Sequence, residues 1–243
     1  MIQQSHIGSI APVGCGLKPC VVTLLNMNTR NLPCFVCFVA FCVGPATFDT
    51  IAAGPTNSWT KPASGSWEEA AYWSQGLPSS GQGAIMFTNE GYKALAIGAN
   101  TSANFSNSLT IQNVVLGAPA DSSNQLLMNF SGLAVPLTVQ GDFNVGAYAS
   151  LVSHYAAIHA GKLLAQGPVI FSDESALTAN VVSLLGGSSF TFNSGLATLG
   201  DLNLETEGQS GTALCNILGG SVQVQNIVTM GRAQSQMCGP WNA

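Results

Sequence analysis

The sequence predicts an all-β protein, and more specifically a parallel β-helix, also called a β-solenoid. Only 7% of the 243 residues are charged whereas 47% are hydrophobic, so uncharged polar residues must supply most of the solvent-facing surface. Between residues 79 and 231 the apolar runs have strand length, and Gly, Asn, Asp or Ser separates them. This stretch keeps no helical apolar spacing beyond two turns with caps at both ends. A β-sandwich or jelly roll is the alternative fold, because it uses similar strands.

A leader-like region opens the chain. Residues 32–48 are almost free of polar side chains, and Arg30 precedes them. Their apolar core LPCFVCFVAFCV is short for a bilayer span, and small residues follow it, so we expect a secretory signal peptide over 27–53. Because Met27 begins a better basic region than the residues before it, we interpret 1–26 as a mis-assigned extension.

The strand-like runs continue to residue 231. LTV, FTF and VQV alternate with period two, as strands do when one row of side chains points inward and the other to solvent. Gly161, Gly187 and Gly220 each precede an apolar run, and the two intervals between them are similar though not equal. Intervals of this size suit one coil, so we assign solenoid repeats to 81–231. We expect an irregular tail over 232–243, for which a truncated gene is one interpretation.

A tryptophan-rich segment, 54–80, precedes the repeats. Its pattern is W…GSW…A..W..G.P, followed by the apolar run AIMF. Together with the later LTVQGDFNVG and GG-terminated units, this pattern resembles bacterial secreted proteins built from autotransporter-associated β-strand repeats, many of which carry a PEP-CTERM sorting tail. The resemblance covers roughly residues 57–231 and implies a parallel β-helix, an exported location and no catalytic residues. Two departures are Tyr72, where the family often has Asn, and the final GRAQSQMCGPWNA, which is not a sorting tail.

Trp59, Trp67 and Trp73 have two interpretations. A solenoid has open ends, so large aromatic side chains beside a turn can close the first coil. This predicts a tryptophan-containing N-terminal cap over 54–80. The alternative is an aromatic platform that stacks against sugar rings, with Glu68 and Glu69 accepting bonds from sugar hydroxyls. As a neighbouring pair, these two glutamates are more typical of a solvated surface.

Three aspartates are candidates for a row of carboxylates. Asp142, Asp173 and Asp201 recur at intervals of about one predicted coil each. Stacked in this way, they could bind a cation or share a proton. Each also stands beside a turn, where aspartate commonly makes local hydrogen bonds. His154 and His159 flank YAAI, a spacing that places them on opposite faces of one strand and argues against joint metal binding.

Composition narrows the function classes. The chain has six lysines and arginines and a net charge of -5, which is unsuited to nucleic acid. GxSxG, HExxH and the phosphate-binding loop are absent from the sequence, so we expect no catalytic activity and no cofactor. The sequence favours an exported, non-enzymatic solenoid that acts as a structural or adhesive protein at the cell surface or in a matrix. A polysaccharide-binding or polysaccharide-cleaving β-helix is the alternative. Expected partners are extracellular polysaccharide or cell-surface components, with membrane contact only through the signal segment.

Overall fold

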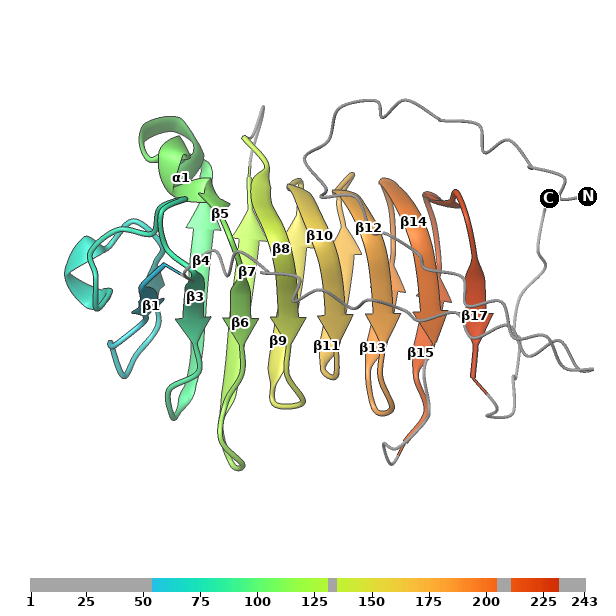
Figure 1. Ribbon diagram of the computed structural model, residues 1–243, viewed down its shortest axis with the longest axis horizontal. Coiled ribbons are helices and arrows are strands. Elements are labelled where there is room, and N and C mark those ends of the chain that lie inside the picture. The colour runs from blue at the N-terminus through green and yellow to red at the C-terminus, as the bar shows by residue number, and fades with distance from the viewer. Residues whose placement is uncertain (1–53, 131–134, 205–210, 232–243) are drawn as a thin grey trace, which may run out of the picture. The chain divides into compact units, whose positions relative to one another are not determined.

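The computed structural model describes residues 54–130, 135–204 and 211–231, which form a parallel β-helix (Figure 1). The predicted leader and tail, 1–53 and 232–243, lie outside the described residues. Every strand pairing between named strands is parallel, and the strands form two sheets. This confirms the predicted β-solenoid and excludes a sandwich or jelly roll, whose sheets are antiparallel.

The first sheet contains ten strands. In spatial order its path is β1 (Thr56–Ser58), β3 (Ala84–Phe87), β6 (Val114–Leu116), β8 (Leu137–Val145), β10 (Ala157–Ala165), β12 (Ala176–Leu184), β14 (Leu196–Leu204) and β16 (Ser221–Val224). Off this path, β5 (Thr110–Ile111) pairs with β8, and β17 (Val228–Met230) pairs with β14. The short strands β5 and β6 therefore occupy together the place that β8 fills alone one coil later.

The second sheet contains seven strands. Their order is β2 (Gly65–Ser66), β4 (Tyr92–Gly98), β7 (Ser123–Asn129), β9 (Ala149–His154), β11 (Pro168–Ser172), β13 (Ser189–Phe192) and β15 (Leu214–Ile217). The helices of the described residues are short and lie near the N-terminal coils: the 3-10 helices η1 (Ala70–Tyr72) and η2 (Ser106–Leu109), and α1 (Ala99–Asn104). In the described part of the chain, no helix is long and apolar enough to cross a membrane.

Coil length varies along the solenoid. His154 and Asp173, which meet across two adjacent coils, are 19 residues apart in the sequence. Gln125 and its register partner Ser150 are 25 residues apart. Nearer the N-terminus, Gly91 and Ser122 meet across adjacent coils at a separation of 31 residues. The coils are therefore not repeats of one fixed length.

The glycine spacing predicted from sequence does not mark the coils. Gly161 lies within β10, where the pairing with β8 is shifted by a bulge. Gly187 lies in the turn before β13 of the second sheet, and Gly220 in the turn before β16 of the first. Because the three glycines occupy different positions in their coils, the intervals between them do not measure a coil.

The bulge explains why β10 needs a glycine. A Cβ added to Gly161 would stand 2.6 Å from the Gln140 carbonyl oxygen and 2.8 Å from that of Gly141, in the preceding coil. A side chain at Gly161 therefore cannot be added without moving the neighbouring backbone.

Stacked apolar side chains fill the interior. In the second sheet Leu95, Leu126, Leu151, Val169 and Phe190 stand in one register column, and each is fully buried. Each such side chain contributes about 1.5–3 kcal/mol through burial. The apolar residues of the period-two pattern that predicted strands therefore point into this core, and the residues between them point to solvent.

Candidate functional site

The three tryptophans of 54–80 lie inside the first coil. Trp59, Trp67 and Trp73 are only 2%, 1% and 4% exposed. The Trp73 ring packs edge to face against both neighbours, with centroid distances of 5.2 Å to Trp59 and 5.1 Å to Trp67. The segment also supplies β1 and β2, which pair in register with β3 and β4. These residues therefore form an incomplete first coil whose interior is aromatic.

Hydrogen bonds satisfy two of the indoles. Trp73 donates its Nε1–H to the Trp67 carbonyl oxygen at 2.8 Å, and Trp67 donates its own to Ser108 Oγ at 3.1 Å. Sugar stacking needs an open ring face, whereas these rings are covered by one another and by Phe87. The arrangement therefore supports the cap interpretation and offers little ring surface to a saccharide.

Glu68 belongs to the cap rather than to an open surface. Its carboxylate accepts hydrogen bonds from Asn100 Nδ2 and Thr101 Oγ1, both at 2.6 Å, in the first turn of α1. Burial alone would raise the pKa of Glu68, but these hydrogen bonds outweigh it and hold the pKa below its ordinary value. Glu68 thus ties the loop after β2 to α1.

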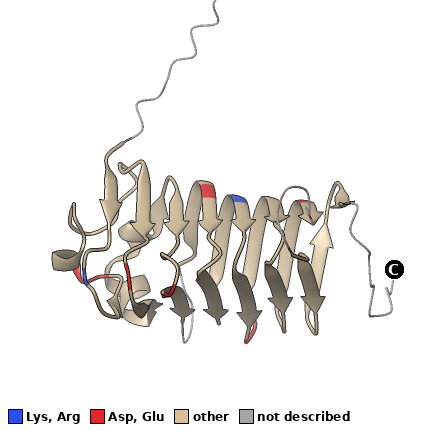
Figure 2. Ribbon diagram, turned by 90° about the horizontal axis from the view of Figure 1, so that it is seen from below, with Lys and Arg blue, Asp and Glu red and all other residues tan. Residues whose placement is uncertain are grey.

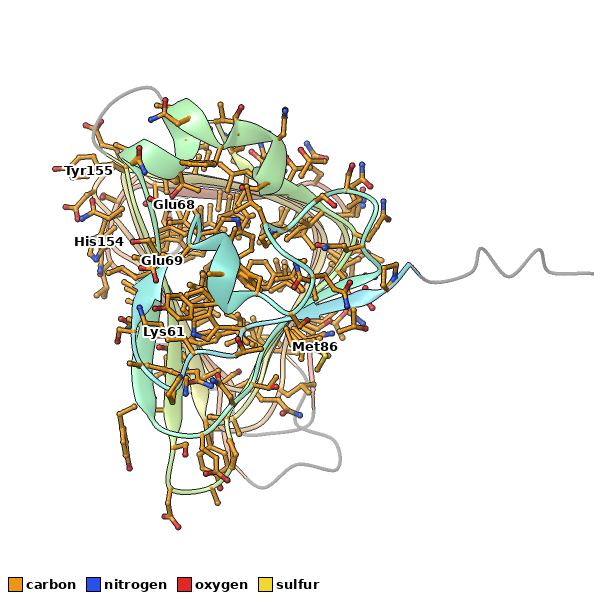
Figure 3. All side chains as sticks on the ribbon, turned by 90° about the vertical axis from the view of Figure 1, so that its left-hand side faces the viewer. Lys61, Glu68, Glu69, Met86, His154 and Tyr155 are labelled. Atoms are coloured by element: carbon orange, nitrogen blue, oxygen red, sulfur yellow. The ribbon has the colours of Figure 1, made fainter. Side chains whose placement is uncertain are left out.

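Glu69 holds the other side of the same loop. Its carboxylate accepts from Lys61 Nζ at 2.9 Å and from the Ser66 backbone N–H at 3.0 Å, and these bonds lower its pKa. Lys61 also lies over the Tyr72 ring, 4.3 Å from its centroid. Figure 3 looks along the solenoid from this end and shows Lys61 and Glu69 side by side. The two glutamates therefore use their charge for structural contacts.

The predicted row of three carboxylates does not form. Asp142 and Asp201 share one register column, in which Lys162 and Val181 lie between them. The two aspartates are therefore three strand spacings apart, about 14 Å.

Asp173 is not in that column at all, because it lies in the turn after β11, in the second sheet. The candidate row fails because one coil is shorter here than the intervals between the aspartates. The turn interpretation holds for Asp173, whereas Asp142 and Asp201 lie within β8 and β14. Along the column from Asp142 to Asp201, register partners in adjacent coils are about 20 residues apart. Spacing in the sequence therefore did not translate into stacking.

Charged residues are sparse along the solenoid, as the coloured ribbon of Figure 2 shows. Among residues 54–130, 135–204 and 211–231, no three His, Cys, Asp or Glu side chains gather as a metal site. Asp201 accepts a hydrogen bond from the Ile227 backbone N–H at 3.3 Å, and the Asp142 backbone N–H donates to Asn113 Oδ1 at 2.9 Å. Both aspartates thus take part in local contacts between adjacent coils.

His154 and Asp173 form a hydrogen-bonded contact between two coils. His154 Nδ1 lies 2.7 Å from Asp173 Oδ2 and 2.7 Å from Ser172 Oγ. The hydrogen bond with His154 lowers the pKa of the Asp173 carboxyl, and a bond from Ser172 adds to this. Sequence analysis missed the contact because its partners meet only through coil register. The sequence predicted that His154 and His159 lie on one strand. This is wrong, because His154 ends β9 and His159 lies on β10 of the other sheet.

The Ser172–His154–Asp173 cluster lacks the geometry of a nucleophilic triad. In such a triad the serine bonds to one imidazole nitrogen and the aspartate to the other. Here both partners approach Nδ1. The cluster stands on the rim of the second sheet, where Asp173 and Glu174 adopt positive φ values of 53° and 60°. Its clearest role is to hold this turn against the preceding coil.

Two exposed tyrosines mark the opposite rim of the second sheet. Tyr92 begins β4 and Tyr148 immediately precedes β9, and they are 79% and 52% exposed. Sequence analysis did not single them out, because they are distant in the sequence and only the coil register brings them together. We call this rim, with Ser123 between them, the tyrosine edge.

Comparisons with protein-family models, with curated proteins and with solved structures found no match. The arguments about function that follow therefore depend on the chain's own residues.

Proposed function

We propose that the protein is an exported, non-enzymatic β-solenoid that acts as a structural or adhesive component of a cell surface or extracellular matrix. Export is inferred from the leader-like composition of 27–53. The carrying observation is the outer face of the second sheet, whose strands contain no Asp, Glu or Arg and whose one lysine, Lys93, is buried. One outward column on it consists of Ala96, Leu127, Val152, Ile170 and Thr191, all partly exposed.

A surface of this kind suits extended partners. Outward side chains recur at each strand spacing, about 4.8 Å, along the solenoid axis. A partner that is itself a regular polymer can therefore make the same contact on several coils, and the small contributions add up. Glu68, Glu69 and Lys61 are engaged in contacts within the cap, which agrees with a structural use of charge.

The proposal is tested by locating the protein and measuring what it holds. The producing cells are separated into cytosol, membrane, cell-surface and medium fractions, and the full-length protein is detected in each. We expect it outside the cytosol, and we expect the purified protein to cosediment with isolated cell-surface or matrix material. Retention entirely in the cytosol, or failure of the folded protein to cosediment, would contradict the proposal.

Polysaccharide cleavage is the second candidate, and the His154–Asp173 pair is the observation that favours it. A partly exposed imidazole beside a carboxylate is a combination that can transfer protons. The test is the release of new chain ends from a panel of neutral and acidic polysaccharides. Release that is abolished in both His154→Ala and Asp173→Asn would replace the non-enzymatic proposal, whereas binding without release supports it.

A further inference from the structure

The tyrosine edge is a row of side chains in register. Tyr92 of β4 lies opposite Ser123 of β7, and the Ser123 backbone N–H donates to the Gly91 carbonyl oxygen at 3.0 Å. In the next coil Asn124 lies opposite Ala149 and its N–H donates to the Tyr148 carbonyl oxygen at 3.2 Å, which places the Tyr148 backbone opposite Ser123. Figure 1 shows β4, β7 and β9 as successive strands of the second sheet. Tyr92 and Tyr148 therefore occupy equivalent positions, two coils apart.

The spacing of the two backbone positions that carry the rings follows from strand geometry. Two strand spacings amount to about 9.5 Å. This is close to the length of a disaccharide unit in an extended β-1,4-linked chain, where every second sugar presents the same face. The C–H groups of a pyranose face pack favourably on the negative face of an aromatic ring. The tyrosines thus stand where alternate sugars of one chain can stack, with the chain parallel to the solenoid axis.

Polar side chains lie beside and between the two rings. Ser123 is exposed between Tyr92 and Tyr148. One outward position further along the strands, Gln125 and Ser150 are partly exposed, and Gln125 Nε2 lies 3.4 Å from Ser150 Oγ. Uncharged donors and acceptors of this kind bind sugar hydroxyls without the cost of removing water from a charge.

The backbone that carries the tyrosines is held from within. Lys93 is only 5% exposed, and its Nζ donates to the Asn89 carbonyl oxygen at 2.9 Å. The buried Asn124 side chain donates to the carbonyl oxygens of Asn89 at 2.8 Å and Gly117 at 2.6 Å. These bonds fix the turns before β4 and β7. A fixed platform loses less conformational entropy on binding than a mobile one.

The charge of the rim selects the kind of chain. Glu90 and Asp121 are exposed on the turns that lead into β4 and β7. They repel a polyanion but not a neutral chain. We propose that the tyrosine edge binds a neutral, extended, β-1,4-linked polysaccharide through stacking on Tyr92 and Tyr148. The inference rests on the proposed adhesive function and assigns it a site and a ligand class.

The test measures retention of the full-length protein in native affinity gels. Hydroxyethylcellulose is the neutral β-linked probe, soluble starch tests chain shape, and polygalacturonate tests charge. The variants are Tyr92→Ala, Tyr148→Ala and their combination. Tyr155→Ala is the matched control, because Tyr155 is 53% exposed but follows β9 at the opposite rim. Circular dichroism checks that each variant is folded.

We expect retardation in hydroxyethylcellulose and much less in starch or polygalacturonate. Each single variant should weaken binding roughly threefold to tenfold, the effect of one lost stacking contact, and the double variant should abolish it. Tyr155→Ala should bind like the unmodified protein. Tyr→Phe at either site should bind nearly as well as the tyrosine.

Three outcomes would overturn the inference. Absence of retardation in hydroxyethylcellulose would show that the protein does not bind neutral β-1,4-linked chains. Equal retardation in polygalacturonate would show that the charge of the rim does not exclude polyanions. Unchanged retardation in the folded double variant removes the site. None of these results decides the proposed function, which is judged separately by fractionation and cosedimentation. A protein that cosediments with matrix yet fails in the gels remains an adhesive solenoid with another ligand.

Discussion

Trp73 donates its indole N–H to the Trp67 carbonyl oxygen at 2.8 Å, while the two rings pack edge to face with centroids 5.1 Å apart. One pair of residues thus closes the first coil both by burial and by a directed hydrogen bond. The bond matters because an indole N–H without a partner is costly in a buried position. This arrangement makes the cap a unit that can be tested by single substitutions.

Trp67→Ala should destabilise the protein strongly. Trp67 is 1% exposed and donates to Ser108 Oγ, so truncation leaves a cavity and removes that hydrogen bond. We expect the free energy of unfolding in urea to fall by about 3–5 kcal/mol. Tyr72→Ala is the control within the same cap, since Tyr72 is 39% exposed, and it should cost about 1 kcal/mol. Equal effects of the two substitutions would argue against an aromatic cap.

Glu68 should make the stability of the cap depend on pH. Its pKa is lowered in the folded protein from an ordinary 4.5, because the bonds from Thr101 and Asn100 outweigh burial. A carboxylate with a lowered folded pKa contributes fully above its unfolded pKa, and the contribution is lost as pH falls through the folded value. We therefore expect the urea midpoint to fall between about pH 5 and pH 3, and to fall less in Glu68→Gln.

The control for this pH dependence is Glu90→Gln, which changes an exposed glutamate on a turn. Its urea midpoint should follow that of the unmodified protein across the same pH range. If the urea midpoint of Glu68→Gln also follows that of the unmodified protein across this pH range, the hydrogen bonds between Glu68 and α1 do not contribute to stability.

Gly161→Ala should be far more damaging than a glycine substitution at an open site. The new Cβ would stand 2.6 Å from the Gln140 carbonyl oxygen, so adjacent coils must separate. We expect a loss of about 2 kcal/mol or more in thermal or urea unfolding. Gly81→Ala is the control, because nothing lies within 4 Å of a Cβ added there, and it should be neutral or slightly stabilising. A neutral Gly161→Ala would show that the bulge accommodates a side chain.

Cys215 should react slowly while the protein is folded. Burial raises the pKa of its thiol to about 11, so little thiolate is present near neutrality. At pH 8 we expect alkylation by iodoacetamide to be about a hundredfold slower than in urea-unfolded protein. Mass spectrometry of the peptide that contains Cys215 measures this rate apart from the other cysteines. Equal alkylation rates in the folded and unfolded protein would mean that the Cys215 thiol is not buried in the folded protein.

The strand content could be predicted because local patterns carry it. LTV, FTF and VQV alternate, and β8, β13 and β16 contain these motifs. The aromatic interior of 54–80 was also predictable, since a solenoid end needs large side chains to cover it. The burial of Trp59, Trp67 and Trp73 agrees with that expectation.

By itself, the sequence determined which residues alternate, which segments turn, and that uncharged side chains face the solvent. The tertiary structure decided which residues meet across coils, because the length of chain in one coil changes along the solenoid. Residues in contact across adjacent coils are 19 residues apart at His154 and Asp173 but 31 residues apart at Gly91 and Ser122. No fixed period therefore translates sequence distance into spatial distance. For this reason the predicted aspartate row failed, while the His154–Asp173 contact and the tyrosine edge appeared only once the register was known.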